Sequence, residues 1–209
     1  MKLKVPFDRV VLLLFHNQHK MCSSLMRVQE RYESPRFRGL VFTHEQYFDW
    51  YATKFGEFDY WSEVLGFNFP GRATTPFYDG RFDPLWKKEK QVLRLLKPYY
   101  DAWGEDFYVI AALATDERSI SHETAHALFY SVPWYRREVK KLVKEWLPRS
   151  TILVRRLKER GYCNAVLTDE INAFVATSSP RSYFCPGSML PLRKELRKLF
   201  RKAKKEAKR

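Results

Sequence analysis

The sequence predicts an α+β protein that is mostly helical and has one small sheet. Hydrophobic residues make up 45% of the 209 residues, with 16% aromatic, which is enough for a buried core. Two short apolar runs have the length and composition of buried strands, and most other segments space their apolar residues as helices do. No apolar run approaches the roughly 18 residues needed to cross a bilayer, and no small-residue cleavage site follows the first strand. We therefore expect a cytoplasmic protein.

The N-terminal elements are predicted from their boundaries. Val10–Phe15 is a continuous apolar run and is expected to be a strand. A helix over 21–32 ends before Ser34-Pro35, because the residue before proline disfavours helical backbone. Thr43 and Gln46 form a capping-box pattern, which opens a helix that runs through residue 54 to Gly56.

The next segment is expected to be irregular. Residues 56–82 are rich in glycine, proline and aromatic residues, and we interpret them as a lobe packed through its aromatic side chains. A substrate-binding rim is the alternative interpretation. Asp83-Pro84 is expected to start a helix that reaches about Lys97, because proline favours the first helical position.

The second half alternates a strand with helices. Residues 107–113 form the second predicted strand, and a helix follows with Thr115-Asp116 or Ser119 as competing caps. A basic amphipathic helix begins at Pro133, and another helix runs to Arg160 before Gly161. A short extended piece is expected to end at Val166-Leu167. Thr168 or Asp169 is then expected to cap a helix over 170–176, and the C-terminal tail repeats leucine at helical spacing.

Charge is concentrated in two of these helical segments. The net charge is +14; residues 134–160 contain ten Lys/Arg against three Glu, and residues 193–209 contain ten against two. Such runs are either solvated helix faces or surfaces for an anionic partner, namely nucleic acid, an acidic protein or a membrane surface. The three cysteines are widely spaced and form no CxxC pair, so a disulfide framework or a cysteine-rich zinc module is not expected.

The chemistry of the chain centres on His122-Glu123-Thr124-Ala125-His126, an HExxH pattern. On a helix, positions i and i+4 project from one face, so both imidazoles can bind one small cation. A zinc ion there would lower the pKa of its bound water from 15.7 to about 7. Glu123 lies beside that face and would take the proton of the water as general base.

A third protein ligand must come from an acidic residue, because no histidine follows His126. The acids between 138 and 159 lie on basic helices, and those after 190 lie in the tail. This leaves Asp169 and Glu170 at the start of a helix that carries small residues and can approach the HExxH helix closely. We predict Glu170 as the ligand, with Asp169 either as the helix cap or as a hydrogen-bond acceptor for an imidazole.

Together with Glu170-Ile171-Asn172-Ala173, the HExxH sequence resembles the gluzincin arrangement HExxH…ExxA, and the ImmA/IrrE-type peptidases are similar small proteins. The resemblance covers about residues 105–180. It implies a zincin-like fold, a zinc-dependent metallopeptidase and a small sheet whose edge strand pairs with an extended peptide or protein substrate. We expect 107–113, the strand that precedes the HExxH helix, to be that edge strand.

The gluzincin resemblance also implies a donor for the oxyanion of the cleaved amide. Tyr162 is our first candidate, and Tyr183 and Tyr130 are the others. We expect three regions: an N-terminal α/β and aromatic-rich lobe over 1–104 packed on the core, a zincin-like metal-binding core over 105–192 and a basic amphipathic tail over 193–209. The alternatives are a basic nucleic-acid-binding protein with a structural or vestigial zinc site, and a toxin-like or mobile-element hydrolase.

Overall fold

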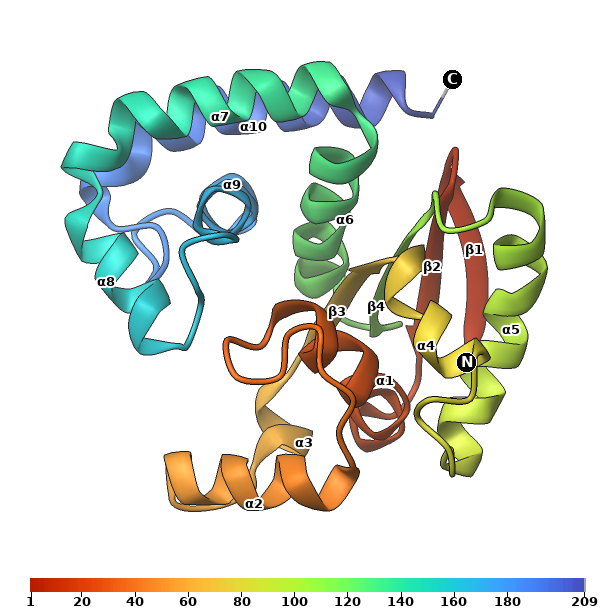
Figure 1. The fold of residues 1–209 in the computed structure, drawn as a ribbon. Coiled ribbons are helices and arrows are strands. Elements are labelled where there is room, and N and C mark those ends of the chain that lie inside the picture. Colours follow the sequence, from red (N-terminus) through yellow and green to blue (C-terminus); the bar gives the residue numbers. More distant parts are fainter. Residues whose placement is uncertain (209) are drawn as a thin grey trace.

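A computed structural model describes residues 1–208, and its centre is a four-stranded mixed sheet in the order β1-β2-β4-β3 (Figure 1). The strands are β1 (Lys2–Phe7), β2 (Val10–Phe15), β3 (Gly66–Pro70) and β4 (Tyr108–Leu113). β1 and β2 pair antiparallel, β2 and β4 pair parallel, and β3 pairs antiparallel with β4. The predicted α+β class and both predicted strands are confirmed, whereas β1 and β3 were not predicted.

The prediction that the strand before the HExxH helix lies at the sheet edge is wrong. β4 is an interior strand, because β2 pairs with one of its sides and β3 with the other. The edge next to the HExxH helix is β3, a segment that falls inside the lobe predicted to be irregular. Glycine and proline are depleted from strand interiors, so the presence of both residue types in this segment argued against a strand.

Ten α-helices and three 3-10 turns surround the sheet in residues 1–208 (Figure 1). In the first half these are α1 (Gln18–Glu33), α2 (His44–Phe55), α3 (Tyr60–Glu63), η1 (Gly71–Ala73), α4 (Thr75–Tyr78) and α5 (Lys87–Trp103). In the second half they are α6 (Glu117–Ser131), α7 (Pro133–Trp146), η2 (Leu147–Arg149), α8 (Thr151–Glu159), α9 (Leu167–Thr177), η3 (Gly187–Met189) and α10 (Leu190–Glu206).

The sheet separates two hydrophobic cores. Val11, Leu13 and Phe15 of β2 face the core shared with α1, α2 and α5. Val10, Leu12 and Leu14 face the core shared with α6 to α10. Because both faces are covered, β2 is apolar at every position, as is typical of strands buried on both sides. Since β4 lies between strands of the first hundred residues, the sheet crosses the predicted boundary after residue 104.

Helix boundaries follow the predicted capping residues with two exceptions. The capping box of α2 is present, with Gln46 N donating to Thr43 Oγ1 and Thr43 N donating to Gln46 Oε1. α5 begins at Lys87 and not at Pro84, because the Glu89 carboxylate accepts a hydrogen bond from the Trp86 amide and fixes the first turn there. Val166 stands at the N-terminus of α9, so neither Thr168 nor Asp169 caps that helix, and no extended piece precedes it.

Glu89 also belongs to a buried ion pair that ties two helices together. Arg27 of α1 donates from Nε and Nη2 to the two carboxylate oxygens of Glu89, at 2.7 and 2.6 Å. Both side chains are buried, and Nη1 of Arg27 donates to the Phe82 carbonyl at 3.1 Å. The two parallel hydrogen bonds fix α1 against α5 on the sheet face opposite the HExxH helix.

The basic C-terminal segment is an integral part of the fold. Leu192, Leu196, Phe200 and Ala203 of α10 are buried in the core, so the apolar face of this helix is fully used. α10 runs antiparallel beside α7, and Lys202 Nζ lies 4.8 Å from the centre of the Trp134 ring (Figure 1). No helix within residues 1–208 has the length and apolarity to cross a membrane.

Candidate metal centre

The two histidines of the HExxH sequence are placed by the first turn of α6. Asp116 Oδ1 accepts hydrogen bonds from the backbone amides of Arg118 and Ser119, both at 3.1 Å. Asp116 is therefore the cap, and Ser119 donates its hydroxyl to the same carboxylate. This start sets the helical register in which His122 and His126 share the face that looks toward α9.

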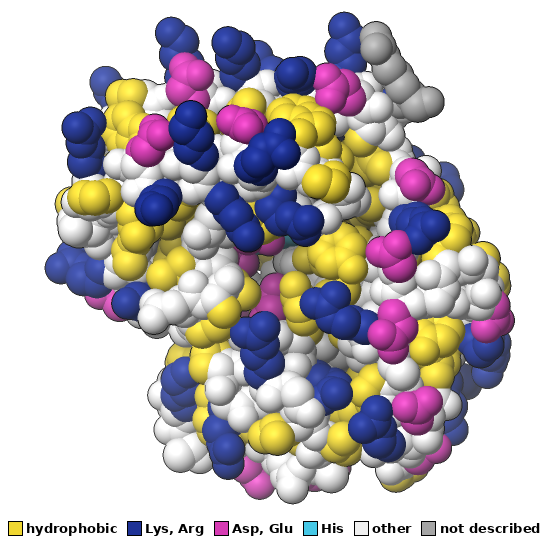
Figure 2. Space-filling model, turned by 45° about the horizontal axis from the view of Figure 1, so that its top comes forward, with side chains coloured by type: hydrophobic (Ala, Val, Ile, Leu, Met, Phe, Trp, Pro, Cys, Tyr) yellow, Lys and Arg dark blue, Asp and Glu magenta, His cyan; other side chains and the backbone are white. Residues whose placement is uncertain are grey.

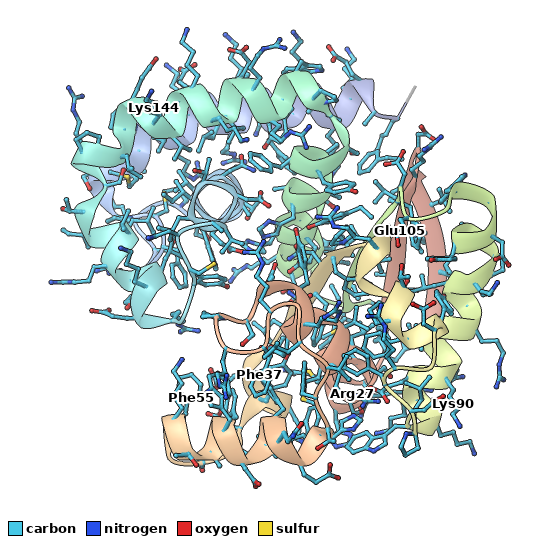
Figure 3. All side chains as sticks on the ribbon, in the orientation of Figure 1. Arg27, Phe37, Phe55, Lys90, Glu105 and Lys144 are labelled. Atoms are coloured by element: carbon cyan, nitrogen blue, oxygen red, sulfur yellow. The ribbon has the colours of Figure 1, made fainter. Side chains whose placement is uncertain are left out.

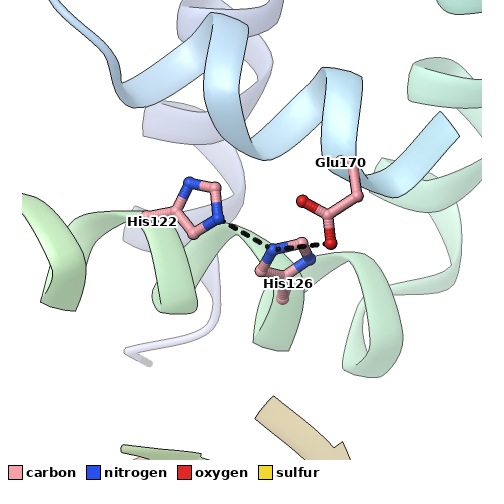
Figure 4. Close-up of side chains that lie close together, drawn as sticks. All are labelled: His122, His126 and Glu170. Atoms are coloured by element: carbon pink, nitrogen blue, oxygen red, sulfur yellow. Dashed lines mark hydrogen bonds and ion pairs between the residues drawn. The ribbon is translucent and has the colours of Figure 1, made fainter. Parts of the chain in front are cut away.

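His122, His126 and Glu170 meet between α6 and α9 (Figure 4). The two Nε2 atoms lie 3.2 Å apart, and Glu170 Oε1 lies 3.7 Å from His126 Nε2. All three ligand atoms lie within 4.8 Å of one another. Two nitrogen ligands of a tetrahedral zinc ion stand about 3.3 Å apart, from bond lengths of about 2.0–2.1 Å. The histidine pair has this spacing.

Small side chains allow the two helices to come this close. Ala125 and Ala127 of α6 and Ala173 and Ala176 of α9 are all buried. Glu170 lies in the first turn of α9 and is 2% exposed. The predicted ligand is thus brought to the histidines by the close packing that the small residues suggest.

Asp169 lies beside the imidazole of His126 and not at the cap of α9. Its Oδ2 lies 2.9 Å from Nδ1 of His126, on the side of the imidazole away from Glu170 and His122. A carboxylate at this nitrogen favours the tautomer that leaves Nε2 free to bind a metal. Asp169 therefore lies within ion-pair distance of the His126 ring and does not cap α9.

Glu123 is buried and held by strand β3. Its Oε2 accepts a hydrogen bond from Asn68 Nδ2 at 3.0 Å, and the Asn68 Oδ1 accepts one from the Tyr108 hydroxyl at 2.6 Å. A Cβ atom added at Gly66 would lie 2.2 Å from Glu123 Oε1. The Glu123 carboxylate is therefore fixed through Oε2. Its other oxygen, Oε1, lies where a side chain at Gly66 would be.

Several carboxylates crowd around the histidines. Burial raises the pKa of Glu123 to about 7, although His126 and Asn68 act to lower it. Burial also raises the pKa of Glu170 to about 8, against the lowering effect of His126. Burial alone would lower the pKa of His126, but the facing carboxylates of Asp169, Glu170 and Glu123 raise it well above its ordinary value. The centre thus gathers several buried carboxyl groups whose ionised forms are disfavoured in the absence of a cation.

A divalent cation fits this arrangement. The Oε2 atom of Glu170 is buried and has no hydrogen-bond partner within residues 1–208, which is costly for a carboxylate. Burial and the nearby His126 lower the pKa of His122, so this imidazole is neutral, as a ligand must be. Two imidazoles and one carboxylate suit zinc, and also suit other first-row divalent metals.

Three residues of the centre were missed from the sequence. Asn68 and Gly66 come from β3, and Glu33 comes from the end of α1. The Glu33 carboxylate accepts a hydrogen bond from Gln29 Nε2 at 2.6 Å. Burial and the neighbouring Glu170 raise its pKa well above the ordinary value. No spacing in the sequence links these residues to the HExxH helix, because only the folded sheet brings them together.

The centre opens into a cleft of about 980 Å³ between the α1–α2 side and the α8–α9 side of the protein. Tyr162 and Tyr183 line this cleft, whereas Tyr130 stacks on Tyr108, with ring centres 4.4 Å apart. Burial raises the pKa of Tyr162 well above its ordinary value, with smaller contributions from Glu170, Glu33 and Glu123. Tyr162 and Tyr183 therefore lie in the lining of the cleft with these carboxylates, whereas Tyr130 does not.

Comparison of the chain with protein-family profiles, with curated proteins and with solved structures gives no match.

Proposed function

We propose that the protein is a zinc-dependent metallopeptidase. The observation that supports this most directly is the position of Glu123. Its carboxylate is held by a hydrogen bond inside the cleft, on the helix that supplies both histidines. A purely structural zinc site closes its coordination with protein ligands. Three protein ligands beside an open cleft, with a fixed carboxylate at hand, are typical of a catalytic site.

Each residue of the centre has a distinct role in this proposal. His122, His126 and Glu170 would hold the metal, and Asp169 would orient His126. A bound zinc ion supplies a Lewis acid that activates water and polarises a carbonyl. Glu123 would accept the proton of the water and deliver it to the leaving amine. Tyr162 would donate a hydrogen bond to the oxygen of the attacked carbonyl.

The substrate in this proposal is an extended peptide or protein segment. The gluzincin resemblance assigns substrate pairing to an edge strand, and β3 is the edge strand beside α6. Val64, Leu65 and Gly66, at and just before the start of β3, line the cleft. This arrangement supports a zincin-like core in which β3 takes the role that the sequence suggested for 107–113.

Metal content and hydrolysis test the proposal together. The purified protein should contain about one zinc per chain, and His126→Ala or Glu170→Ala should lose most of it. Glu123→Gln should keep the zinc and the fold but lose cleavage of substrates found in a proteome-wide screen. Glu145→Gln is the matched control, because Glu145 is an exposed acid on α7. Near-normal cleavage by Glu123→Gln would rule out the general-base mechanism.

A basic surface supports a second function, binding of nucleic acid. We define the basic ridge as the exposed Lys and Arg side chains of α7 and α10 (Figures 2 and 3). Its residues are Arg137, Lys140, Lys141, Lys144, Lys194, Lys198, Arg201, Lys202 and Lys205. Within residues 1–208, no large apolar side chain is exposed on α7 or α10. Insertion of a helix into a membrane needs such side chains, whereas phosphate binding does not.

Charge-neutralised variants test the basic ridge without disturbing the core. Lys194→Gln, Lys198→Gln and Arg201→Gln together should weaken binding to duplex DNA and RNA. The plot of log affinity against log salt should become shallower by up to about 2.7, at about 0.9 for each phosphate that is no longer neutralised. The matched control replaces the three exposed residues Lys87, Lys90 and Arg94 of α5 with Gln. Equal weakening by both variants, or no binding at low salt, would show that the basic ridge is a solvated surface and does not bind nucleic acid.

A further inference from the structure

Strand β3 presents chemically different faces to the two sides of the sheet. Phe67 and Phe69 are buried in the core shared with α1 and α5. Gly66 and Asn68 alternate with them and therefore face α6. On this face the Glu123 carboxylate accepts a hydrogen bond from the Asn68 amide. It also lies against Gly66, which has no side chain.

The Asn68 amide is itself held in one orientation. The Tyr108 hydroxyl of β4 donates to Asn68 Oδ1 at 2.6 Å, so the amide oxygen faces the tyrosine. The NH2 group is then turned toward Glu123, where it donates to Oε2 at 3.0 Å. The backbone amide of Asn68 donates to Gln29 Oε1 at 3.1 Å, which fixes this part of β3 against α1. Asn68, Tyr108 and Glu123 are all buried.

We propose that Asn68 is a positioning residue that sets the Glu123 carboxylate for its work as a base, with Tyr108 fixing the Asn68 amide. The proposal rests on the proposed peptidase function, and it adds residues from β3 and β4 that the HExxH sequence does not contain. A carboxylate on a flexible side chain works as a base only when it is held within hydrogen-bond reach of the proton that it takes. Asn68 supplies this restraint from a rigid strand, and it acts through Glu123.

The first test compares Asn68→Ala in two backgrounds. In the zinc-loaded wild-type protein, Asn68→Ala should lower kcat about 10–100-fold, as expected for a misplaced reacting group. KM and zinc content should stay within about twofold. In the Glu123→Gln background the same change should lower the residual activity no further, because residues that act as a unit are not additive. An equal loss in both backgrounds, or loss of the metal, would overturn the proposal.

The second test needs neither metal nor activity. In the metal-free protein, the side-chain amide protons of Asn68 should exchange slowly with solvent, as measured by nuclear magnetic resonance. Glu123→Ala and Tyr108→Phe should each speed this exchange at least tenfold. Tyr135→Phe is the matched control, because Tyr135 also donates a buried hydroxyl to an asparagine, Asn172, at 2.8 Å. It should leave the exchange at Asn68 unchanged.

The two tests separate the possible failures. If the wild-type protein cleaves no substrate, the peptidase function fails while the exchange measurement still reports on Asn68. If Asn68 exchanges as fast in the wild type as in Glu123→Ala, the contact does not hold the carboxylate and the positioning role is refuted. If Asn68→Ala does not fold, Tyr108→Phe provides the same test through the loss of one oxygen atom. Its kcat should fall severalfold, with KM and zinc content unchanged.

Discussion

Gly66→Ala should separate the stability of the protein from its activity. The Cβ atom of the new alanine would lie 2.2 Å from Glu123 Oε1, whereas real Cβ atoms essentially never approach a neighbour within 3.0 Å. The carboxylate oxygen must therefore move by at least about 0.8 Å. A misplacement of about 1 Å at a reacting group costs about 100-fold in rate, so we expect kcat to fall by up to this factor.

The cost in stability should be limited to the loss of one hydrogen bond. The atom that clashes is at the far end of a side chain, so a rotation of Glu123 relieves the contact at the expense of its hydrogen bond to Asn68. Such a hydrogen bond to a carboxylate contributes about 1.5–3 kcal/mol to the free energy of unfolding. Zinc content should not change, because the ligand atoms belong to α6 and α9.

The assay combines steady-state kinetics, metal analysis and denaturant unfolding of the same preparations. Gly187→Ala is the matched control, because a Cβ atom there meets no heavy atom within 4 Å. It should change neither kcat nor the free energy of unfolding by a measurable amount. A Gly66→Ala protein with wild-type kcat would refute the reasoning, since it would show that the reaction does not need the carboxylate where β3 holds it.

Three further predictions concern other parts of the structure. Asp169→Asn should weaken zinc affinity about 10–100-fold, measured by competition with a chelator, because the His126 ring loses its partner. The raised pKa of Glu170, about 8, means that the folded metal-free protein keeps a proton that the unfolded chain releases above about pH 4.5. Its free energy of unfolding should therefore fall as pH rises from about 5 to 8, and Glu170→Gln should flatten this dependence. Leu196→Ala in α10 should cost about 2–5 kcal/mol in denaturant unfolding, because the side chain is fully buried.

The sequence predicted best where local chemistry decides the structure. The capping box at Thr43 and Gln46 and the helix that starts at Pro133 both depend on residues within one helical turn. The meeting of His122, His126 and Glu170 could also be predicted, because two ligands share one helix and few acids follow them. Small residues on α6 and α9 then indicated which helices could approach each other.

Prediction failed where distant segments decide the structure. β1 alternates lysine with apolar residues and becomes a strand through its pairing with β2. β3 is short and bounded by Gly66 and Pro70, so only its pairing with β4 identifies it. The contact between Asn68 and Glu123 joins residues 55 positions apart. No local pattern encodes such a contact, which explains why the residues that hold the base were missed.

The parallel pairing of β2 with β4 joins the two halves of the chain through contacts between residues far apart in the sequence. Val10 pairs with Tyr108, so the sheet closes only after a loop of about a hundred residues has been ordered. Contacts at such sequence separation form slowly, because the entropy of the loop is lost before the contact is gained. The candidate metal ligands all lie on α6 and α9, so zinc binding would stabilise the second half of the chain and does not itself depend on this closure.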